Sequence, residues 1–380
     1  MRHLYLAATG QNRGKTTAAL GFLDGFVREG LVTGFMKPVG QRTVIQDGVP
    51  ADEDAILMRA VFDLPDPLPA MSPVHIPRGF TKAYIAGDVV EDLPARIRAA
   101  HATFADHDVL LVEGTGHAGV GAVVGLSNAA VAALLGVPAV IVSEGGVGRP
   151  IDEIVLNASL FRAHGVRLAG AIVNKVELDA QPGIVRTLER GLALHGIALL
   201  GVLPYRPILS NPTLGMILEG VHGETIHPGP DLDAVIGGVA IGAMEPGHML
   251  ERIGPQTLVI VPGDREDVIR TVIGASALGA SSLGPAALGP AALGPGRAAL
   301  GLVLTGGYRP RPAVVEAIRR ADLFATLVAE DTYPVASKVH DLLVKTHPAD
   351  REKIALIKAL VAEHLDIDRI LSAATVAGAR

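Results

Sequence analysis

The sequence has no cysteine and no tryptophan, and only 3% of its 380 residues are aromatic. Without cysteine, the chain can form no disulfide, offers no thiolate ligand to a metal ion and has no cysteine nucleophile. This absence is compatible with the reducing cytoplasm, where we expect the protein. Because aromatics are scarce while hydrophobic residues make up 49% of the chain, the core must be built from Ala, Val, Leu and Ile, as is common in parallel α/β sheets.

The chain also lacks a strong charge of either sign. Its 33 Lys and Arg residues against 39 Asp and Glu residues leave a net charge of −6. No cluster of basic residues marks a nucleic-acid surface, so we expect no nucleic-acid partner. The opening MRHLYLAATG runs directly into a motif and leaves no room for a signal peptide, so we do not expect export by that route.

The stretch that lies between His117 and Glu144 has no charged residue and resembles a membrane span in length. Glycines and Pro138 interrupt it, whereas a spanning helix needs about 20 predominantly apolar residues. We therefore expect a loop, a short buried helix over 128–135 and a buried strand over 139–142, and no membrane partner.

The first half of the chain alternates short apolar runs with helical stretches, for example a helix over 16–29 and another over 95–104. This alternation is typical of βαβ units and predicts an α/β fold with a doubly wound, mostly parallel sheet. The expected strands are 4–8, 32–36, 108–112, 139–142, 168–173 and 199–202.

The length predicts two domains. We expect the first over 1–205, and a linker rich in Pro, Gly and His over 206–234. A second, smaller α/β domain should follow over 235–345, with strands at 257–261, 300–304 and 324–328. The repeated LGPAA segment at 274–298 reads as a flexible surface insertion, and 346–380 as a C-terminal amphipathic helix, over 350–364, with a tail.

The strongest motif is TGQNRGKT, from Thr9 to Thr16, between a predicted strand and a predicted helix. Glycines let backbone N–H groups turn toward a phosphate, Lys15 reaches its oxygens and Thr16 can bind magnesium. Thr9 replaces the usual first glycine, and the alternative is an ordinary glycine-rich turn. The candidate nucleotide-binding residues here are Thr9, Gly10, Asn12, Gly14, Lys15, Thr16 and Thr17.

Acidic residues that could complete a magnesium site occur twice. Glu113 follows the buried run VLLV at the carboxyl end of a strand, the edge at which ligands gather in open α/β sheets. Asp54 lies in the cluster 52–54, which alone would read as the solvated start of a helix. A helix cap or a surface carboxylate is the alternative role for Glu113.

Two further residues end predicted strands. Lys37 would place a cation near the γ-phosphate, although a lone lysine often extends into solvent. Asn174 carries an amide that could read a purine edge, with a turn asparagine as the equal alternative. The run NKVE at 174–177 is similar to the guanine-reading motif of GTPases with Glu177 at its acid position, so GTP remains the alternative to ATP.

Taken in order, the residues TGQNRGKTT, FMKPVG, DEDAILM, LLVEGTG and AIVNK resemble dethiobiotin synthetase and its relatives in the cobyrinic acid a,c-diamide synthase group, over about 1–205. The resemblance implies that Lys15 and Lys37 are catalytic and that Asn174 reads the base. It also implies a metal site formed by Thr16, Asp54 and Glu113.

The second half resembles the DRTGG domain through 262–265, 304–307 and 330–333. Together the halves resemble the N-terminal region of long bacterial phosphate acetyltransferases, where the region is regulatory. The 380 residues leave no length for a transferase domain, so we do not expect acetyl transfer from this chain. A homodimer formed through the DRTGG domain is a further expectation. Turn and capping chemistry is the alternative to ligand binding for these residues.

Three functions remain open. The first is a magnesium-dependent ATP-binding protein with a regulatory or sensor role, and slow ATPase activity, coupled to the DRTGG domain. The second is an ATP-dependent ligase that phosphorylates a small carboxylate or carbamate. The third is an inactive assembly scaffold. The segment after Glu113 reads GTGH where the biotin enzyme has Gly-Ala-Gly-Gly, so substrate contacts do not transfer, and the absence of cysteine excludes glutamine-dependent amidation within this polypeptide.

Overall fold

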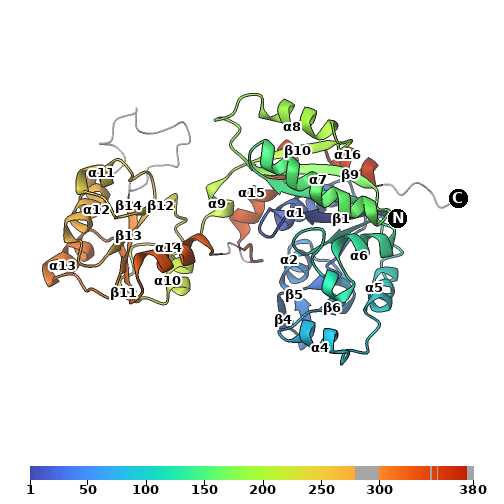
Figure 1. The fold of residues 1–380 in the computed structure, drawn as a ribbon, viewed down its shortest axis with the longest axis horizontal. Helices are drawn as coiled ribbons and strands as arrows, with labels where there is room; N and C mark the ends of the chain where they lie inside the picture. The colour runs from blue at the N-terminus through green and yellow to red at the C-terminus, as the bar shows by residue number, and fades with distance from the viewer. Residues whose placement is uncertain (279–298, 343–344, 349, 375–380) are drawn as a thin grey trace. The chain divides into compact units, whose positions relative to one another are not determined.

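The computed structural model describes residues 1–278, 299–342, 345–348 and 350–374, which form two compact units (Figure 1). Unit 1 comprises Met1–Tyr205 together with Thr346–Arg380, and unit 2 comprises Arg206–Lys345. Most of the expected insertion, from 279 to 298, lies outside the described residues. Among the described helices, none combines the length and apolarity needed to cross a membrane.

Unit 1 is built on a six-stranded sheet in the order β10-β9-β8-β1-β7-β2, and every neighbouring pair is parallel. The predicted doubly wound parallel sheet is therefore confirmed. Its central strands are mainly apolar and buried, because helices cover both faces. The strands are β1 (Arg2–Ala8), β2 (Thr33–Met36), β7 (Val109–Glu113), β8 (Ala139–Glu144), β9 (Leu168–Val176) and β10 (Leu199–Pro204).

The direction in which the chain winds changes at β1. The chain leaves β1 through α1 (Lys15–Arg28) toward β2, and then returns past β1 toward β10. Because parallel crossovers are right-handed, α1 lies on one face and the later helices lie on the other. Those later helices are α5 (Leu93–Ala102), α6 (Asn128–Leu135), α7 (Gly148–Ala163) and α8 (Ile184–Ala193). The switch leaves a crevice at the carboxyl end of β1, where ligands bind in such sheets.

A group of small elements, which we did not predict, separates β2 from α5. Its hairpin pairs β4 (Thr43–Gln46) with β5 (Val49–Asp52), and Asp47 and Gly48 both have the positive φ that a two-residue type I′ turn requires. The hairpin leads directly into α2. The other elements between β2 and α5 are α2 (Glu53–Phe62), α3 (Leu68–Met71), β3 (Val39–Gly40) paired with β6 (Val74–His75), and α4 (Phe80–Ala86). A short 3-10 turn, η1 (Ala122–Val124), follows β7 later in the chain.

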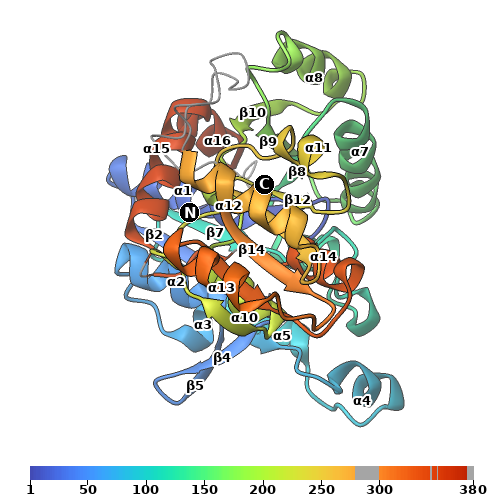
Figure 2. The same ribbon diagram turned by 90° about the vertical axis from the view of Figure 1, so that its left-hand side faces the viewer.

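The C-terminal segment packs against the first helix of unit 1. Helix α15 (Arg351–His364) lies beside α1, and α16 (Ile367–Ala374) contacts β1 and β9 (Figures 1 and 2). The contact is close, because a Cβ added at Gly21 would lie 2.2 Å from the Val361 side chain. Glycine therefore allows α1 and α15 to approach each other.

Unit 2 is the expected smaller α/β domain, with a five-stranded sheet in the order β11-β15-β14-β13-β12. Strand β11 is antiparallel to β15, and the other pairs are parallel. Two clusters of buried apolar residues cover the two faces. One is formed with α11 (Pro246–Leu250), α12 (Glu266–Leu278) and α13 (Pro312–Arg320), and the other with α10 (Leu214–Val221) and α14 (Thr332–His340). The strands are β11 (Glu224–His227), β12 (Gly238–Ile241), β13 (Thr257–Pro262), β14 (Ala299–Thr305) and β15 (Phe324–Leu327).

The expected linker over 206–234 belongs to unit 2 instead. It contains α9 (Pro207–Ser210), α10 (Leu214–Val221) and β11, and α10 buries Leu214, Ile217 and Val221 in the core. The Pro, Gly and His residues that suggested a linker therefore lie around short, packed elements.

The three motif segments of unit 2 meet at the carboxyl edge of its parallel strands. The backbone N–H of Gly263 donates to Thr305 O at 3.0 Å, and that of Gly306 donates to Glu330 O at 2.8 Å. The hydroxyls of Thr305 and Thr332 lie 2.7 Å apart. These contacts join the three turns to one another, which is the turn and capping chemistry that we set beside ligand binding.

Candidate functional site

The P-loop joins β1 to α1 at the switch point. Gly14 is the N-cap of α1 with φ 95°, a left-handed conformation that suits glycine, and no side chain caps the helix. No acidic residue lies in the first turn. The N-terminal N–H groups of a 14-residue helix therefore face the crevice together with its positive dipole end, which is the arrangement that binds phosphate.

Charged residues on neighbouring elements hold the P-loop in place. The hydroxyl of Thr9 donates to Glu153 Oε2 at 2.9 Å, and Lys175 Nζ donates to Asn12 O at 2.9 Å. Arg13 forms an ion pair with Glu144 at the end of β8. Thr9 and Asn12 thus lie in the predicted loop, but Thr9 is engaged with α7. Thr17 follows in the first turn of α1 and is half-buried.

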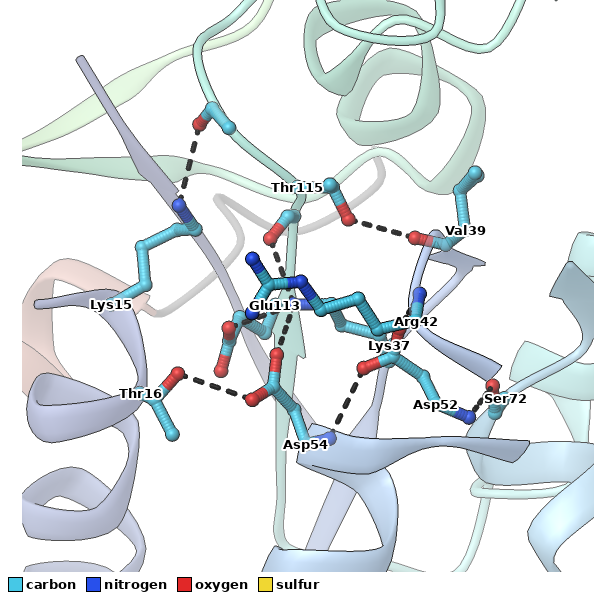
Figure 3. A network of polar contacts seen from close by, with 12 residues as sticks. Lys15, Thr16, Lys37, Val39, Arg42, Asp52, Asp54, Ser72, Glu113 and Thr115 are labelled. Atoms are coloured by element: carbon cyan, nitrogen blue, oxygen red, sulfur yellow. Dashed lines mark hydrogen bonds and ion pairs between the residues drawn. The ribbon is translucent and has the colours of Figure 1, made fainter. Parts of the chain in front are cut away.

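Lysine and carboxylate side chains from four elements converge beside this loop (Figure 3). Lys37, directly after β2, extends its Nζ to within 2.6 Å of Asp54 Oδ2 on α2 and 2.8 Å of Glu113 Oε1 at the end of β7. Thr16 on α1 donates to Asp54 Oδ1 at 3.2 Å. The structure thus brings together Thr16, Lys37, Asp54 and Glu113, as expected from the carboxyl edge of a parallel sheet.

Lys15 lies next to this cluster with weaker contacts. Its Nζ is 3.3 Å from Gly10 O and 3.5 Å from Gly116 O, which is long for a hydrogen bond from an ammonium, and the side chain is only 8% exposed. Burial, with the nearby charge of Lys37, lowers the pKa of Lys15 from 10.5 to about 8. An anion in the crevice would offer Lys15 a stronger partner than these carbonyls do.

Burial and charge set the protonation of the cluster. Burial raises the pKa of the Glu113 carboxyl from 4.5 to about 7, against the opposing charge of Lys37. Burial alone would lower the pKa of Lys37, but the carboxylates of Asp54 and Glu113 outweigh it and raise that pKa. Lys37 therefore remains an ammonium at neutral pH. For Asp54, the charge of Lys37 outweighs burial and lowers the pKa.

The oxygen donors of the cluster fit a magnesium ion. Glu113 Oε2 is buried and has no hydrogen-bond partner among the described residues, so a ligand-capable oxygen is left over. In the described part of the chain, no three His, Cys, Asp or Glu residues group around one point. Magnesium commonly takes one or two carboxylates together with phosphate oxygens and water, so Thr16, Asp54 and Glu113 would suffice as protein ligands.

Asn174, which we expected to read the base, lies beneath the P-loop. Its Nδ2 donates to Arg13 O at 3.2 Å, and the side chain is 6% exposed. A Cβ added at Gly14 would lie 1.9 Å from the same Nδ2. In this structure Asn174 therefore positions the loop, and base recognition by Asn174 remains a prediction.

Sequence reasoning missed the residue that shapes the loop after β7. Asn128, 4% exposed, donates through Nδ2 to Thr115 O and His117 O, both at 2.7 Å, and accepts from Tyr5 Oη at 2.9 Å. This loop supplies the Gly116 carbonyl to Lys15. A buried amide at the start of an otherwise apolar helix was the available signal, and we read that helix only as core.

A pocket of about 480 Å³ opens beside the P-loop at the carboxyl ends of β8, β9 and β10. Its lining is strongly charged and includes Arg13, Glu144, Arg149, Lys175, Glu177 and Tyr205. Lys175 and Glu177 come from the segment that the sequence singled out as base-reading. The pocket therefore offers space and polar groups next to the phosphate-binding loop.

The raised pKa of Glu113 predicts a pH-dependent stability. The pKa of the Glu113 carboxyl is about 7 in the folded protein and 4.5 in the unfolded chain, so the folded state binds this proton more tightly. The resulting stabilisation of the fold is fully present below pH 4.5 and is lost as pH rises through 7. Glutamine does not titrate, so Glu113→Gln does not lose this stabilisation. Between pH 5 and pH 8, its free energy of unfolding should therefore rise relative to that of wild type by up to about 3 kcal/mol. Urea unfolding without metal measures this, and parallel pH profiles for the two proteins would refute it.

Two family matches divide the chain. Residues 2–213 match the family described as an AAA domain, and residues 216–342 match the DRTGG domain. The first match contains the P-loop, the lysine and carboxylate cluster and the charged pocket. The second contains most of α10 and all of β11, as well as the three motif segments at the carboxyl edge of unit 2.

Known proteins similar to the chain include phosphate acetyltransferases. The enzyme of Nitrosomonas europaea is 24% identical over 96% of this chain and 50% of that protein, and the enzyme of Pseudomonas putida is 28% identical over 96% and 51%. The chain therefore spans about half the length of these relatives. Among solved structures, the septum site-determining protein MinD of Pyrococcus horikoshii, complexed with Mg-ADP, is 14% identical over 55% of this chain and 83% of that one, with a TM-score of 0.35.

Proposed function

Because this chain belongs to the AAA-domain family of P-loop proteins and carries a DRTGG domain, as the sequence predicted, we propose that it binds ATP with magnesium and serves a regulatory or sensor role. Slow hydrolysis in unit 1 would be coupled to unit 2. We also place the protein in the cytoplasm and infer a homodimer formed through the DRTGG domain.

The observation that carries this proposal is the cluster of Lys37, Asp54 and Glu113, of which Lys37 and Glu113 are buried, beside an uncapped P-loop helix. Thr16, Asp54 and Glu113 would hold the magnesium, which would neutralise phosphate charge. Lys15, poorly satisfied by carbonyls, would bind the phosphate oxygens. We place the nucleoside in the charged pocket that Lys175, Glu177 and Tyr205 help to line, with ATP favoured over GTP.

A ligase of the dethiobiotin synthetase type is the second candidate, and one observation favours it. Lys37 is a buried cation beside the P-loop, held by Asp54 and Glu113, and we propose that it would reach the γ-phosphate, a contact that a binding-only protein does not need. Such an enzyme would phosphorylate a small carboxylate or carbamate, with Lys37 stabilising charge on the transferred group. The relatives named phosphate acetyltransferase are chains of about twice this length.

The deciding experiment is magnesium-dependent hydrolysis of ATP and GTP by the purified protein, with and without 7,8-diaminononanoate and bicarbonate. A sensor should bind nucleotide tightly and hydrolyse it slowly, with no response to the substrate pair. Strong stimulation by the pair would establish the synthetase instead. A protein that binds neither nucleotide by calorimetry would exclude both candidates.

A further inference from the structure

Lys37 makes more contacts within the cluster than any other side chain in it. Its Nζ has three N–H donors, and three oxygens lie within reach: Asp54 Oδ2 at 2.6 Å, Glu113 Oε1 at 2.8 Å and Gly114 O at 3.2 Å. The side chain is 4% exposed, so these donors face the protein interior. Oxygens of the protein itself thus satisfy every donor of the ammonium.

Two of these oxygens belong to the carboxylates that we assign to magnesium. A cation is therefore already present between Asp54 and Glu113, and a divalent ion arriving alone would meet strong repulsion from the Lys37 charge at close range in a buried site. The charges of the cluster support this view, because Lys15 and Lys37 offset two of the three nearby acids, Asp52, Asp54 and Glu113. Little net negative charge remains to attract a metal ion.

Bound nucleotide changes this balance, because its phosphates add several negative charges and offer oxygens to both lysines. The backbone of Lys37 is held by its N–H bond to Met71 O at 2.6 Å and by the following Pro38, so only the four-carbon side chain needs to turn. The carboxylates that it releases then become available to the metal.

We infer that the Lys37 ammonium holds the place of the metal in the nucleotide-free protein, so that a divalent cation binds between Asp54 and Glu113 only together with nucleotide. This inference rests on the proposed function, since it concerns the regulation of the same site. It predicts an obligatory order in which a metal ion does not load the empty site.

The test measures Mn²⁺ binding to nucleotide-free protein from the electron paramagnetic resonance signal of the free ion. Lys37→Met removes the cation and should bind Mn²⁺ on the order of tenfold more tightly than wild type. Lys37→Arg keeps the charge and should behave like wild type. In Lys37→Met with Glu113→Gln, the gain should disappear, because one ligand is lost. Wild type and Lys37→Met binding Mn²⁺ equally well would overturn the inference.

Circular dichroism establishes whether Lys37→Met folds, since it leaves buried carboxylates without their partner. If it does not fold, wild type provides the result. If wild type binds Mn²⁺ without nucleotide, and Glu113→Gln does not, the inference is overturned. If wild type binds Mn²⁺ only after ADP is added, the inference is supported. A wild type that binds no nucleotide would refute the proposed function, while the nucleotide-free comparison with Lys37→Met would still decide the inference.

Discussion

Replacing Lys15 with alanine is expected to weaken ATP binding by at least about 100-fold, since a charge-assisted contact to phosphate is lost. The effect should be large because Lys15 has no strong partner of its own, with only two carbonyls at 3.3 and 3.5 Å. For the same reason, its loss should leave the fold intact. Titration calorimetry with ATP and magnesium measures the change.

The matched control is Lys82→Ala, which removes an exposed lysine of α4 away from the cluster. It should bind ATP as the wild-type protein does. Equal ATP affinities for wild type and Lys15→Ala, with both proteins folded, would show that the nucleotide does not bind at this P-loop.

Replacing Glu113 with glutamine is expected to keep nucleotide binding but to raise the magnesium concentration needed for half-maximal hydrolysis, by about 10- to 100-fold. The change keeps the shape of the side chain but removes one of the two carboxylates available to the metal, and magnesium strongly prefers charged oxygen ligands. Lys37 keeps its contact with Asp54 at 2.6 Å, so the cluster retains one ion pair. A magnesium titration of ATP hydrolysis measures the shift.

The control for this variant is Glu189→Gln. Glu189 is an exposed acid of α8 in the same unit, and it belongs neither to the P-loop, nor to the Lys37 cluster, nor to the lining of the charged pocket. Its magnesium titration should match that of wild type. An unaltered titration for Glu113→Gln would remove this residue from the metal site.

The long apolar strands of unit 1 could be predicted because each is buried on both faces and reads as a continuous apolar run, as β7 does. Strands β11 and β12 could not, because each has four residues and is partly exposed at a sheet edge. The hairpin of β4 and β5 carried a signal in Asp47-Gly48, but it lies in a segment for which we predicted no elements. Packing of α15 on α1 depends on distant contacts such as that of Gly21 with Val361, which no local pattern reveals.

The sequence predicts which residues lie at the site, but not which contacts they make with one another. Lys37 and Glu113 end adjacent parallel strands, which alone places them at one edge. Distances depend on side-chain packing, so the sequence could not show that the Lys37 ammonium lies between two carboxylates. It also could not show that Asp52 caps α2 by accepting from the Asp54 N–H, which helps to place the Asp54 carboxylate. The amide of Asn174 has two plausible uses, and only its contact with Arg13 favours loop positioning here.

The packing of α15 on α1 makes the first unit discontinuous in sequence. The chain leaves unit 1 at Tyr205 and re-enters it at Thr346, so the DRTGG domain is inserted between two segments of the first unit. A fragment cut at Tyr205 would strip α1, the helix that begins with Lys15 and Thr16, of its covering partner around Gly21. A movement of the DRTGG domain that shifts its two ends would therefore act through the covalent chain on β10 and on α15. Helix α15 packs on α1, the helix that follows the P-loop.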